Sequence, residues 1–312
     1  MTKIKTLPIQ AAFIADGFGM ESLADALIAA PEIEVAGVVC PDAKRCERLA
    51  VTDGVLVTPD LPTLLAQRSV DVLLLYSNDV EAILEACAVK SDLPSAIFVH
   101  AVAGSGVKVL HERESALGLP SSSVLAPALY GKSYGLVRAS INEGRVSSPR
   151  FMRWTRWEFV EGSSQLEGLL ANELAAITDL MGQAPVRAYA AGHAVRSSTI
   201  DYVTATLTFQ HGLTAVLDVG SVSAGGRPFN RAMLIGANGS IHVDSHTPAV
   251  LHFDDDQASP LDIETPFDAY VRAVEAFIDN GDCLEGQALR FATATTEAIL
   301  GSIESGRPED VQ

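Results

Sequence analysis

Short aliphatic runs alternate with helical segments over the first third of the chain, and this alternation constrains the fold most. The run Val70–Tyr76 is strongly β-branched and aliphatic, which is typical of a parallel strand buried on both faces. Further strands are expected at Ile9–Ala15, Glu34–Val39, Val55–Val57 and Ala96–Val99, with helices at Ser22–Ala30, Pro41–Ala50, Leu61–Gln67 and Val80–Val89. Strands that alternate with helices predict a parallel sheet with right-handed crossovers. We expect this α/β domain to cover residues 1–123.

A different pattern begins after Val124. The segment Phe151–Val160 alternates like a strand, and a helix over Leu166–Met181 should end at Gly182. Further strands are expected at Val186–Ala190, Tyr202–Gln210, Thr214–Ser221, Ala232–Gly236 and Ser240–Val243, with a hairpin turn at His211-Gly212 and helices at Tyr134–Asn142, Phe267–Asn280 and Gly286–Ser305. A run of strands flanked by helices predicts a second α/β domain over residues 124–312, with an open, mostly antiparallel sheet.

Charge and cysteine usage restrict the partners. The formal net charge is −17, and nucleic acid or an anionic membrane would need a basic face, so we expect neither. No signal peptide and no apolar run of about 20 residues is present, which predicts a cytoplasmic protein. The cysteines form no CxxC pair, so we expect no metal site and four reduced thiols, at Cys40, Cys46, Cys87 and Cys283.

Several short segments follow one another in a characteristic order. They are Leu64-Leu65 with Val70–Leu75, Asn142–Val146, Asp179–Gly182, Pro185-Val186, Glu275–Ile278 and Ser305–Pro308. In this order and spacing they resemble the Gfo/Idh/MocA oxidoreductase family over nearly the whole chain. The resemblance implies an N-terminal Rossmann domain, a C-terminal α/β domain with an open sheet, and hydride transfer between a nicotinamide cofactor and a sugar, polyol or related carbonyl compound.

The glycine-rich loop after the first strand is only partly present. A dinucleotide fingerprint places three glycines there, and the corresponding residues are Ala15, Gly17 and Met20, with an additional Gly19. A helix N-terminus in this position can still bind an anion such as a pyrophosphate. We assign Ala15, Gly17 and Gly19 to the cofactor; the alternative is a tight turn that binds nothing.

The second strand of such a domain should end in an acid that binds the adenosine ribose. Cys40 has that position, and Asp42 follows two residues later. Lys44 and Arg45 could meet a 2′-phosphate, so NADP is as well supported as NAD. The family segment after the fourth strand keeps only Asn78. We assign Cys40, Asp42 and Asn78 to the cofactor; the alternative is a solvated charge cluster and no cofactor.

The usual proton-transfer residues of the family are missing. Its Glu-Lys-Pro segment after the fifth strand corresponds to His100-Ala101-Val102, so alanine stands where the lysine would be. Its Gly-x-His-x-x-Asp segment places Asn172 at the histidine and Ala175 at the aspartate. His100 is a catalytic candidate because it ends a parallel strand and histidine titrates near neutral pH. Otherwise it is a polar residue at a strand end.

Polar groups near the start of the second domain could replace the missing proton-transfer residues. The resemblance places a substrate-lining run after Ala126, and here it carries Tyr130, Lys132 and Tyr134. We expect Tyr130 and Lys132 to be catalytic and Tyr134, Asn172 and Glu173 to bind the substrate. The alternatives are a packed tyrosine, a solvated lysine and a plain helix surface.

The long strand Phe151–Val160 predicts an interface. Trp154, Arg156 and Glu158 share one of its faces. We expect this to be the open face of the sheet, packed against a second copy in a homo-oligomer.

Three functions fit these residues. The first is an NAD(P)-dependent oxidoreductase with a proton relay through His100, Tyr130 or Lys132. Such a relay would have to replace the missing lysine and histidine, because loss of a positioned acid without replacement costs about 10²- to 10⁴-fold in rate. The second is a cofactor-free lyase or isomerase. The third is a catalytically silent ligand-binding or regulatory subunit. The sequence leaves open whether the protein is an enzyme.

Overall fold

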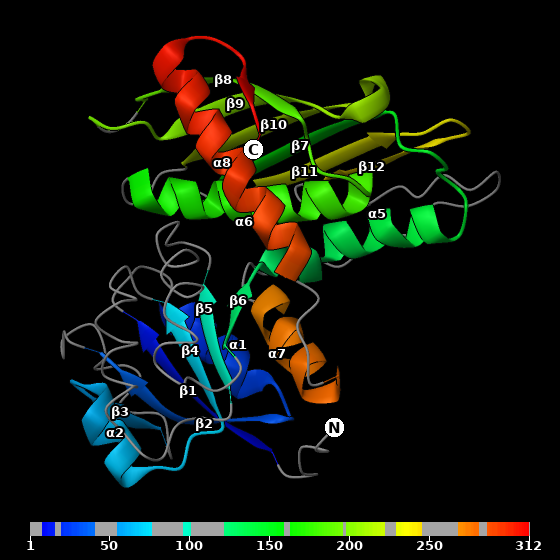
Figure 1. Ribbon diagram of the computed structural model, residues 1–312. Helices are drawn as coiled ribbons and strands as arrows, with labels where there is room; N and C mark the ends of the chain where they lie inside the picture. The colour runs from blue at the N-terminus through cyan, green and yellow to red at the C-terminus, as the bar shows by residue number, and fades with distance from the viewer. Residues whose placement is uncertain are drawn as a thin grey trace. The chain divides into compact units, whose positions relative to one another are not determined.

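The computed structural model describes residues 8–15, 20–40, 55–76, 96–100, 122–158, 163–195, 198–221, 229–244, 268–280 and 286–311. The chain forms two compact units, Met1–Leu125 with Tyr270–Glu285 and Ala126–Ala269 with Gly286–Gln312 (Figure 1). The division along the chain lies close to the predicted boundary after residue 123. The grouping of Tyr270–Glu285 with the first unit had no counterpart in the sequence analysis.

The first unit contains a six-stranded parallel sheet in the order β3-β2-β1-β4-β5-β6. Its strands are β1 (Ile9–Ala15), β2 (Ile33–Val39), β3 (Leu56–Thr58), β4 (Val72–Tyr76), β5 (Ala96–His100) and β6 (Ser122–Leu125). Among the described residues, the helices of this unit are α1 (Met20–Ala29), α2 (Leu61–Gln67) and most of α7 (Asp268–Asn280). This strand order is that of a dinucleotide-binding Rossmann sheet, so the predicted fold of this part is confirmed.

The core of this sheet is built from small and aliphatic residues. Ala11, Ala12 and Phe13 in the central strand β1 are fully buried. In β2, a Cβ on Gly37 would lie 2.6 Å from Leu64 Cδ1 and 2.7 Å from Leu56 O, so only glycine lets α2 and β3 pack this closely. The helix α2 begins at the cap Asp60, whose side chain accepts a hydrogen bond from Thr63 N at 2.7 Å.

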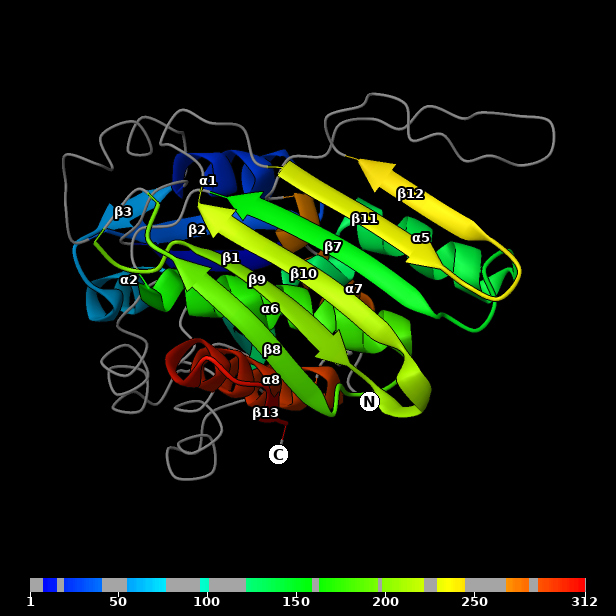
Figure 2. The same ribbon diagram turned by 90° about the horizontal axis from the view of Figure 1, so that it is seen from above.

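The second unit contains a seven-stranded sheet in the order β12-β11-β7-β10-β9-β8-β13 (Figure 2). Its strands are β7 (Phe151–Glu158), β8 (Arg187–His193), β9 (Tyr202–Thr208), β10 (Thr214–Ser221), β11 (Phe229–Ile235), β12 (Ser240–Asp244) and β13 (Glu309–Asp310). The strands β7 and β10 pair in parallel, and the other pairs are antiparallel. This confirms the predicted open, mostly antiparallel sheet.

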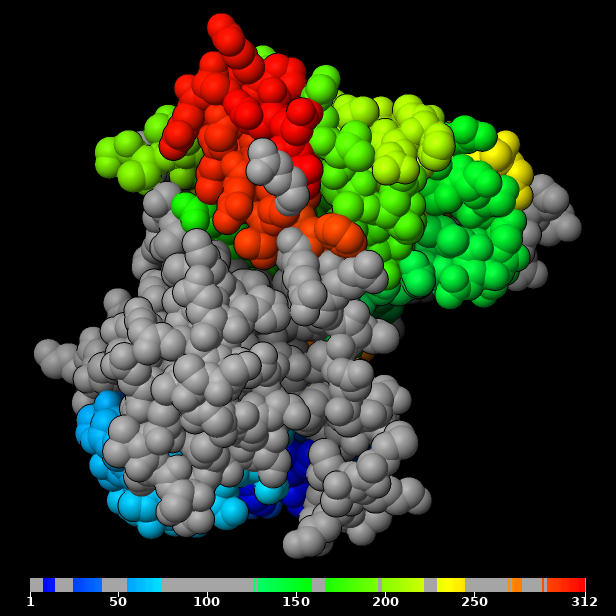
Figure 3. All heavy atoms as spheres, in the orientation of Figure 1, coloured from blue at the N-terminus to red at the C-terminus, as the bar shows by residue number. Residues whose placement is uncertain are grey.

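Helices cover one face of this sheet. They are α5 (Lys132–Asn142), α6 (Ser163–Met181) and α8 (Gly286–Ser305), and a 3-10 helix, η2 (Pro127–Tyr130), precedes α5. The helix α5 packs on β11 and β12, α6 on β7 and β10, and α8 on β8. Figure 3 shows α8 at the surface of this side. None of the described helices of the second unit lies on the opposite face, which we call the open face (Figure 2).

Local signals set the ends of these elements as predicted. The helix α6 ends at Gly182 with φ +69°, a left-handed conformation that favours glycine. The strands β9 and β10 form a hairpin whose turn includes His211 (φ +62°) and Gly212 (φ +77°). No helix in the described residues is long and apolar enough to cross a membrane.

The face of β7 that was expected to be open is the covered one. Trp154 is 1% exposed, and its indole Nε1 donates a hydrogen bond to Glu173 on α6. The open face carries Arg153, Thr155 and Trp157 instead. The prediction was wrong because both faces of this strand mix aromatic and charged residues. The alternation therefore separates the residues into two faces, but it does not indicate which face is buried.

Candidate functional site

A buried polar cluster joins β7 to the middle of α6 in the second unit. Glu173 is 2% exposed, and its Oε2 accepts a hydrogen bond of 2.6 Å from Trp154 Nε1. Its Oε1 accepts a hydrogen bond of 2.9 Å from Asn172 Nδ2 and lies 3.9 Å from Arg156 Nε. Both carboxylate oxygens of Glu173 therefore have partners inside the protein.

Arg156 continues the cluster toward the end of β7. Its Nη2 and Nε lie 2.7 and 3.1 Å from Glu158 Oε2. The side chains of Arg156 and Glu158 are 18% and 26% exposed, against 2% for Glu173. The cluster thus runs from a fully buried carboxylate to a partly accessible ion pair, and one guanidinium faces two carboxylates.

Burial controls the ionisation of Glu173. Desolvation raises the pKa of Glu173 above its ordinary value, while Arg156 and the hydrogen bonds from Trp154 and Asn172 act in the opposite direction. A buried carboxyl with a perturbed pKa is a common feature of functional sites, and it also occurs in structural networks.

Asn172 lies inside the protein rather than on a helix surface. It is 9% exposed, and its Oδ1 accepts a hydrogen bond of 3.0 Å from the backbone N–H of Ala128 in η2. Its Nδ2 donates to Glu173. The amide of Asn172 therefore links η2 to the buried carboxylate.

Tyr130, Lys132 and Tyr134 lie together where η2 passes into α5. Tyr130 and Lys132 are half-buried. The hydroxyl of Tyr134 donates a hydrogen bond of 2.5 Å to Asp179 Oδ2 on α6, and Arg138 Nη1 lies 2.9 Å from the same oxygen. Burial, together with this bond to Asp179, raises the pKa of Tyr134 above its ordinary range. Tyr134 therefore keeps its proton at neutral pH and ties α5 to α6.

The predicted residues of the first unit that the structure describes lie at one edge of its sheet. Ala15 is the last residue of β1, His100 is the last residue of β5, and Cys40 directly follows β2. Carboxyl ends of parallel strands share an edge, where open α/β sheets bind ligands. Gly17, Gly19, Asp42 and Asn78 lie outside the described residues.

Cys40 differs from its prediction as a reduced thiol. It is buried, its backbone N–H donates to Thr58 O at 2.8 Å, and its sulfur is in a disulfide. The other three cysteines lie outside the described residues. The prediction of four reduced thiols is therefore wrong for Cys40, because absence of a CxxC pair in the sequence says nothing about cysteines that the fold brings together.

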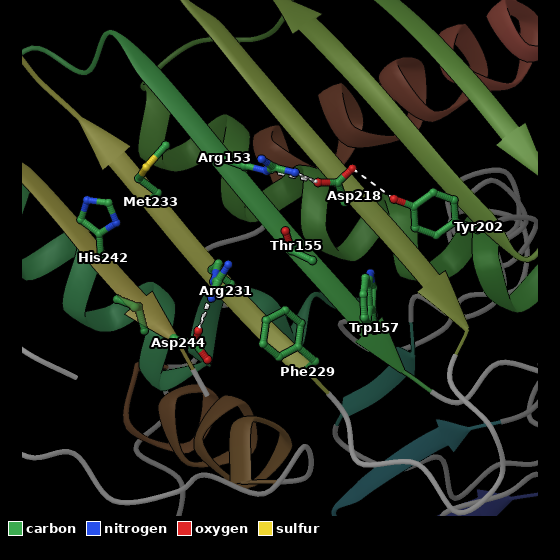
Figure 4. Close-up of a pocket in the computed structure, with 11 residues that line it drawn as sticks. Arg153, Thr155, Trp157, Tyr202, Asp218, Phe229, Arg231, Met233, His242 and Asp244 are labelled. Atoms are coloured by element: carbon green, nitrogen blue, oxygen red, sulfur yellow. Dashed lines mark hydrogen bonds and ion pairs between the residues drawn. The ribbon is translucent and has the colours of Figure 1, made fainter. Parts of the chain in front are cut away.

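A second group of polar and aromatic side chains lies on the open face of the second unit (Figure 4). Asp218 is buried, and it binds Arg153 Nη2 at 3.1 Å and Thr204 Oγ1 at 2.9 Å. Arg231 binds Asp244 Oδ2 at 2.7 Å, and its Cζ lies 5.6 Å from the ring centroid of Phe229. Sequence reasoning missed this group, because its members come from β7, β9, β10, β11 and β12 and meet only through strand pairing.

The residues that line a hollow of about 760 Å³ include Arg153, Asp218, Phe229, Arg231 and Asp244. The hollow and the cluster around Glu173 are on opposite sides of the sheet, since Trp154 points to α6 while Arg153 and Thr155 line the hollow. Among the described residues, no group of three or more histidine, cysteine, aspartate or glutamate side chains could hold a metal ion. We interpret the hollow as a feature of the open face of the sheet rather than as a substrate pocket.

Comparison with protein-family models identifies the second unit. Residues 136–242 match the model described as "GFO/IDH/MocA C-terminal domain". Over these residues the chain is similar to the C-terminal domain of that family. The predicted resemblance to the family is thereby confirmed, and the replacement of its usual lysine and histidine stays a prediction. A comparison with curated proteins finds no sequence match.

Solved structures match over nearly the whole chain. A putative myo-inositol dehydrogenase from Sinorhizobium meliloti has a TM-score of 0.77 and 17% identity, covering 97% of this chain and 100% of that one. Myo-inositol 2-dehydrogenase from Lactobacillus plantarum has a TM-score of 0.77 and 18% identity, covering 98% and 100%. Scyllo-inositol dehydrogenase from Lactobacillus casei, with NAD(H) and scyllo-inositol bound, has a TM-score of 0.74 and 11% identity, covering 97% and 99%. At these identities the likeness shows a shared fold.

Proposed function

We propose that this protein is an NAD(P)-dependent oxidoreductase that acts on a sugar, polyol or related small carbonyl compound. The observation that carries the proposal is the combination of a Rossmann sheet, in the order β3-β2-β1-β4-β5-β6, with a GFO/IDH/MocA C-terminal domain in one chain. The match over 97% of this chain to a dehydrogenase with NAD(H) and scyllo-inositol bound supports the same class of cofactor and substrate.

The first unit fits the pyrophosphate end of a dinucleotide. The strand β1 ends at Ala15 and α1 begins at Met20, so a four-residue connection leads from the central strand to a helix N-terminus, the arrangement that binds phosphate groups. Ala15, Gly17 and Gly19 would hold the pyrophosphate, and Asp42 and Asn78 would bind farther along the cofactor. The fit is poorer at the ribose, where the buried, disulfide-bonded Cys40 offers no carboxylate. When bound, the nicotinamide supplies or accepts the hydride.

The proton must be moved by a side chain of this protein. Tyr134 is a poor candidate because its hydroxyl is committed to Asp179, and Asn172 and Glu173 are committed to each other and to their buried partners. We assign proton transfer to Lys132 or Tyr130 in the second unit, because the resemblance places both in the run that lines the substrate, with His100 as the candidate in the first.

Single substitutions test this assignment. We expect Lys132→Met or Tyr130→Phe to lower kcat by about 10²- to 10⁴-fold, the range for loss of a positioned acid or base. The assay is cofactor reduction with myo-inositol and a panel of sugars and polyols. Arg145→Met is the matched control, because it removes one exposed cation beyond the end of α5. Turnover that survives Lys132→Met, Tyr130→Phe and His100→Ala at the wild-type rate would contradict the proposed relay.

A catalytically silent or cofactor-free protein of the same fold is the second candidate. The observation that favours it is Cys40, which is buried and disulfide-bonded at the position where the resemblance places a ribose-binding acid. A protein that binds a polyol and fails to bind NAD or NADP would support this candidate.

We also propose that the open face of the second unit pairs with a second copy. Large apolar side chains are exposed on it, including Trp157 (40%), Ile235 (40%) and Tyr189 (49%). Six strands spaced ~4.8 Å apart and about seven residues long give roughly 650 Å², close to the ~800 Å² per partner of a standard interface. Arg153 and Arg231 on this face are each paired with a carboxylate of the same sheet, so these cations do not stand unpaired against a facing copy.

Sedimentation of the purified protein tests this interface. We expect the wild type to be dimeric or larger at micromolar concentration and Trp157→Glu to be monomeric, because a charge buried in an interface is strongly unfavourable. Ile28→Glu is the control, since Ile28 in α1 has the same 40% exposure. A wild type that sediments as a monomer would exclude this interface.

A further inference from the structure

The residue at the position of the family histidine is joined to the backbone of the protein. The Oδ1 of Asn172 accepts a hydrogen bond of 3.0 Å from Ala128 N, and its Nδ2 donates one of 2.9 Å to Glu173 Oε1. Asn172 is only 9% exposed. The oxygen of this amide binds Ala128 and its nitrogen binds Glu173, so the two partners together define the orientation of the Asn172 side chain.

Glu173 is in turn held by β7. Its second oxygen accepts the 2.6 Å hydrogen bond from Trp154 Nε1, and both side chains are at most 2% exposed. Arg156 on the same strand lies 3.9 Å from its first oxygen. The rotamer of Glu173 is therefore set by a central strand of the sheet, and this fixes where Oε1 meets Asn172.

These hydrogen bonds lead from Glu173 through Asn172 to the segment that carries the proposed catalytic residues Tyr130 and Lys132. Ala128 lies in the four-residue helix η2, which ends at Tyr130, and Lys132 begins α5 after a single glycine. The residue at the N-cap of η2, Ala126, makes no side-chain capping bond. The hydrogen bond from Ala128 N to Asn172 thus ties η2 to α6 at a point two residues before Tyr130.

We propose that Asn172 and Glu173 are positioning residues: the chain Trp154–Glu173–Asn172–Ala128 N holds η2 in place and so orients Tyr130 and Lys132. The catalytic consequence rests on the function proposed above, whereas the mechanical link does not. Asn172, which has the position of the family histidine, therefore holds the backbone of η2 in place instead of contacting the substrate.

The link is tested by hydrogen exchange of the Ala128 amide, measured by NMR on the full chain. We expect exchange to be about tenfold faster in Asn172→Ala, the effect of losing one hydrogen bond. Glu173→Ala should also accelerate it, although Glu173 does not touch Ala128. Glu173→Gln should restore part of the protection, because a glutamine has one acceptor for the two donors Trp154 Nε1 and Asn172 Nδ2.

Glu167→Gln, on the same helix and outside the cluster, is the matched control and should leave Ala128 unchanged. Protection of the Leu180 amide shows in each variant that α6 is still folded. An Ala128 amide that exchanges at the wild-type rate in Asn172→Ala or in Glu173→Ala would overturn the proposal, whatever the activity of the protein.

Kinetics test the consequence for the reaction. Misplacing a catalytic group by about 1 Å can cost up to about 100-fold in rate, so we expect kcat to fall in Glu173→Ala, with KM for the cofactor unchanged and partial rescue in Glu173→Gln. Failure to bind NAD or NADP would refute the proposed function and leave the exchange result intact. A wild-type kcat in Glu173→Ala, together with fast Ala128 exchange, would refute the positioning role alone.

Discussion

At the scale of single residues, the second unit shows how a carboxylate is kept inside a protein. Glu173 accepts hydrogen bonds from Trp154 and Asn172 and lies near the guanidinium of Arg156. Burial without such partners would cost several kcal/mol or force the group to take up a proton. The cluster compensates only part of this cost, because desolvation is the largest influence on the pKa of Glu173 and raises it.

The raised pKa of Glu173 predicts how stability changes with pH. The folded protein holds this proton more tightly than the unfolded chain, whose glutamate has a pKa near 4.5. The resulting stabilisation is complete below pH 4.5 and is lost as the pH rises through the folded pKa. We therefore expect the free energy of unfolding of the wild type to fall, relative to Glu173→Gln, as the pH rises above 4.5.

Urea unfolding of both proteins across this pH range measures the difference. Comparing how the free energy of unfolding changes with pH removes the constant cost of the hydrogen bond that glutamine cannot make. Glu167→Gln reports the effect of removing a carboxylate elsewhere on α6. Parallel pH curves for the wild type and Glu173→Gln would show that the protonation of Glu173 is not linked to folding.

At the scale of elements, local signals were sufficient for most boundaries. The helix α8 has the predicted bounds Gly286–Ser305, and α6 ends before Gly182 as expected, because periodicity and a C-cap glycine are encoded in adjacent residues. The strand order of the second sheet could not be derived in this way, because β7 pairs with β10 and β11, which follow it by many residues. The buried face of β7 was assigned wrongly because both of its faces mix aromatic and charged residues.

Two glycines, one inside α5 and one directly after α6, should respond in opposite directions to substitution by alanine. Gly182 has φ +69°, so we expect Gly182→Ala to destabilise the protein by about 1 kcal/mol. Gly135 lies inside α5, and a Cβ there would meet nothing within 4 Å, so Gly135→Ala should stabilise it by about 0.4–1 kcal/mol. Chemical denaturation of both variants provides the measurement, and a stabilising Gly182→Ala would contradict the assigned helix end.

At the scale of the whole molecule, the fold class was predictable and the functional site only in part. Strand–helix alternation and a later run of strands are enough to define two α/β domains of different kinds. The site depends on contacts across the chain, such as Ala128 with Asn172 and Trp154 with Glu173, which no local pattern contains. Sequence analysis therefore selected Asn172 and Glu173 as substrate-binding residues, whereas the structure joins their side chains to each other and to buried partners.

We propose above all that the Rossmann unit binds a nicotinamide cofactor. Calorimetric titration of the purified protein with NADH and with NADPH tests it most directly, after the cofactor content of the protein as isolated has been determined. We predict micromolar binding of one of the two, or a cofactor that copurifies with the protein. No heat of binding at millimolar concentration of either, with no copurified cofactor, would contradict the assignment as an oxidoreductase.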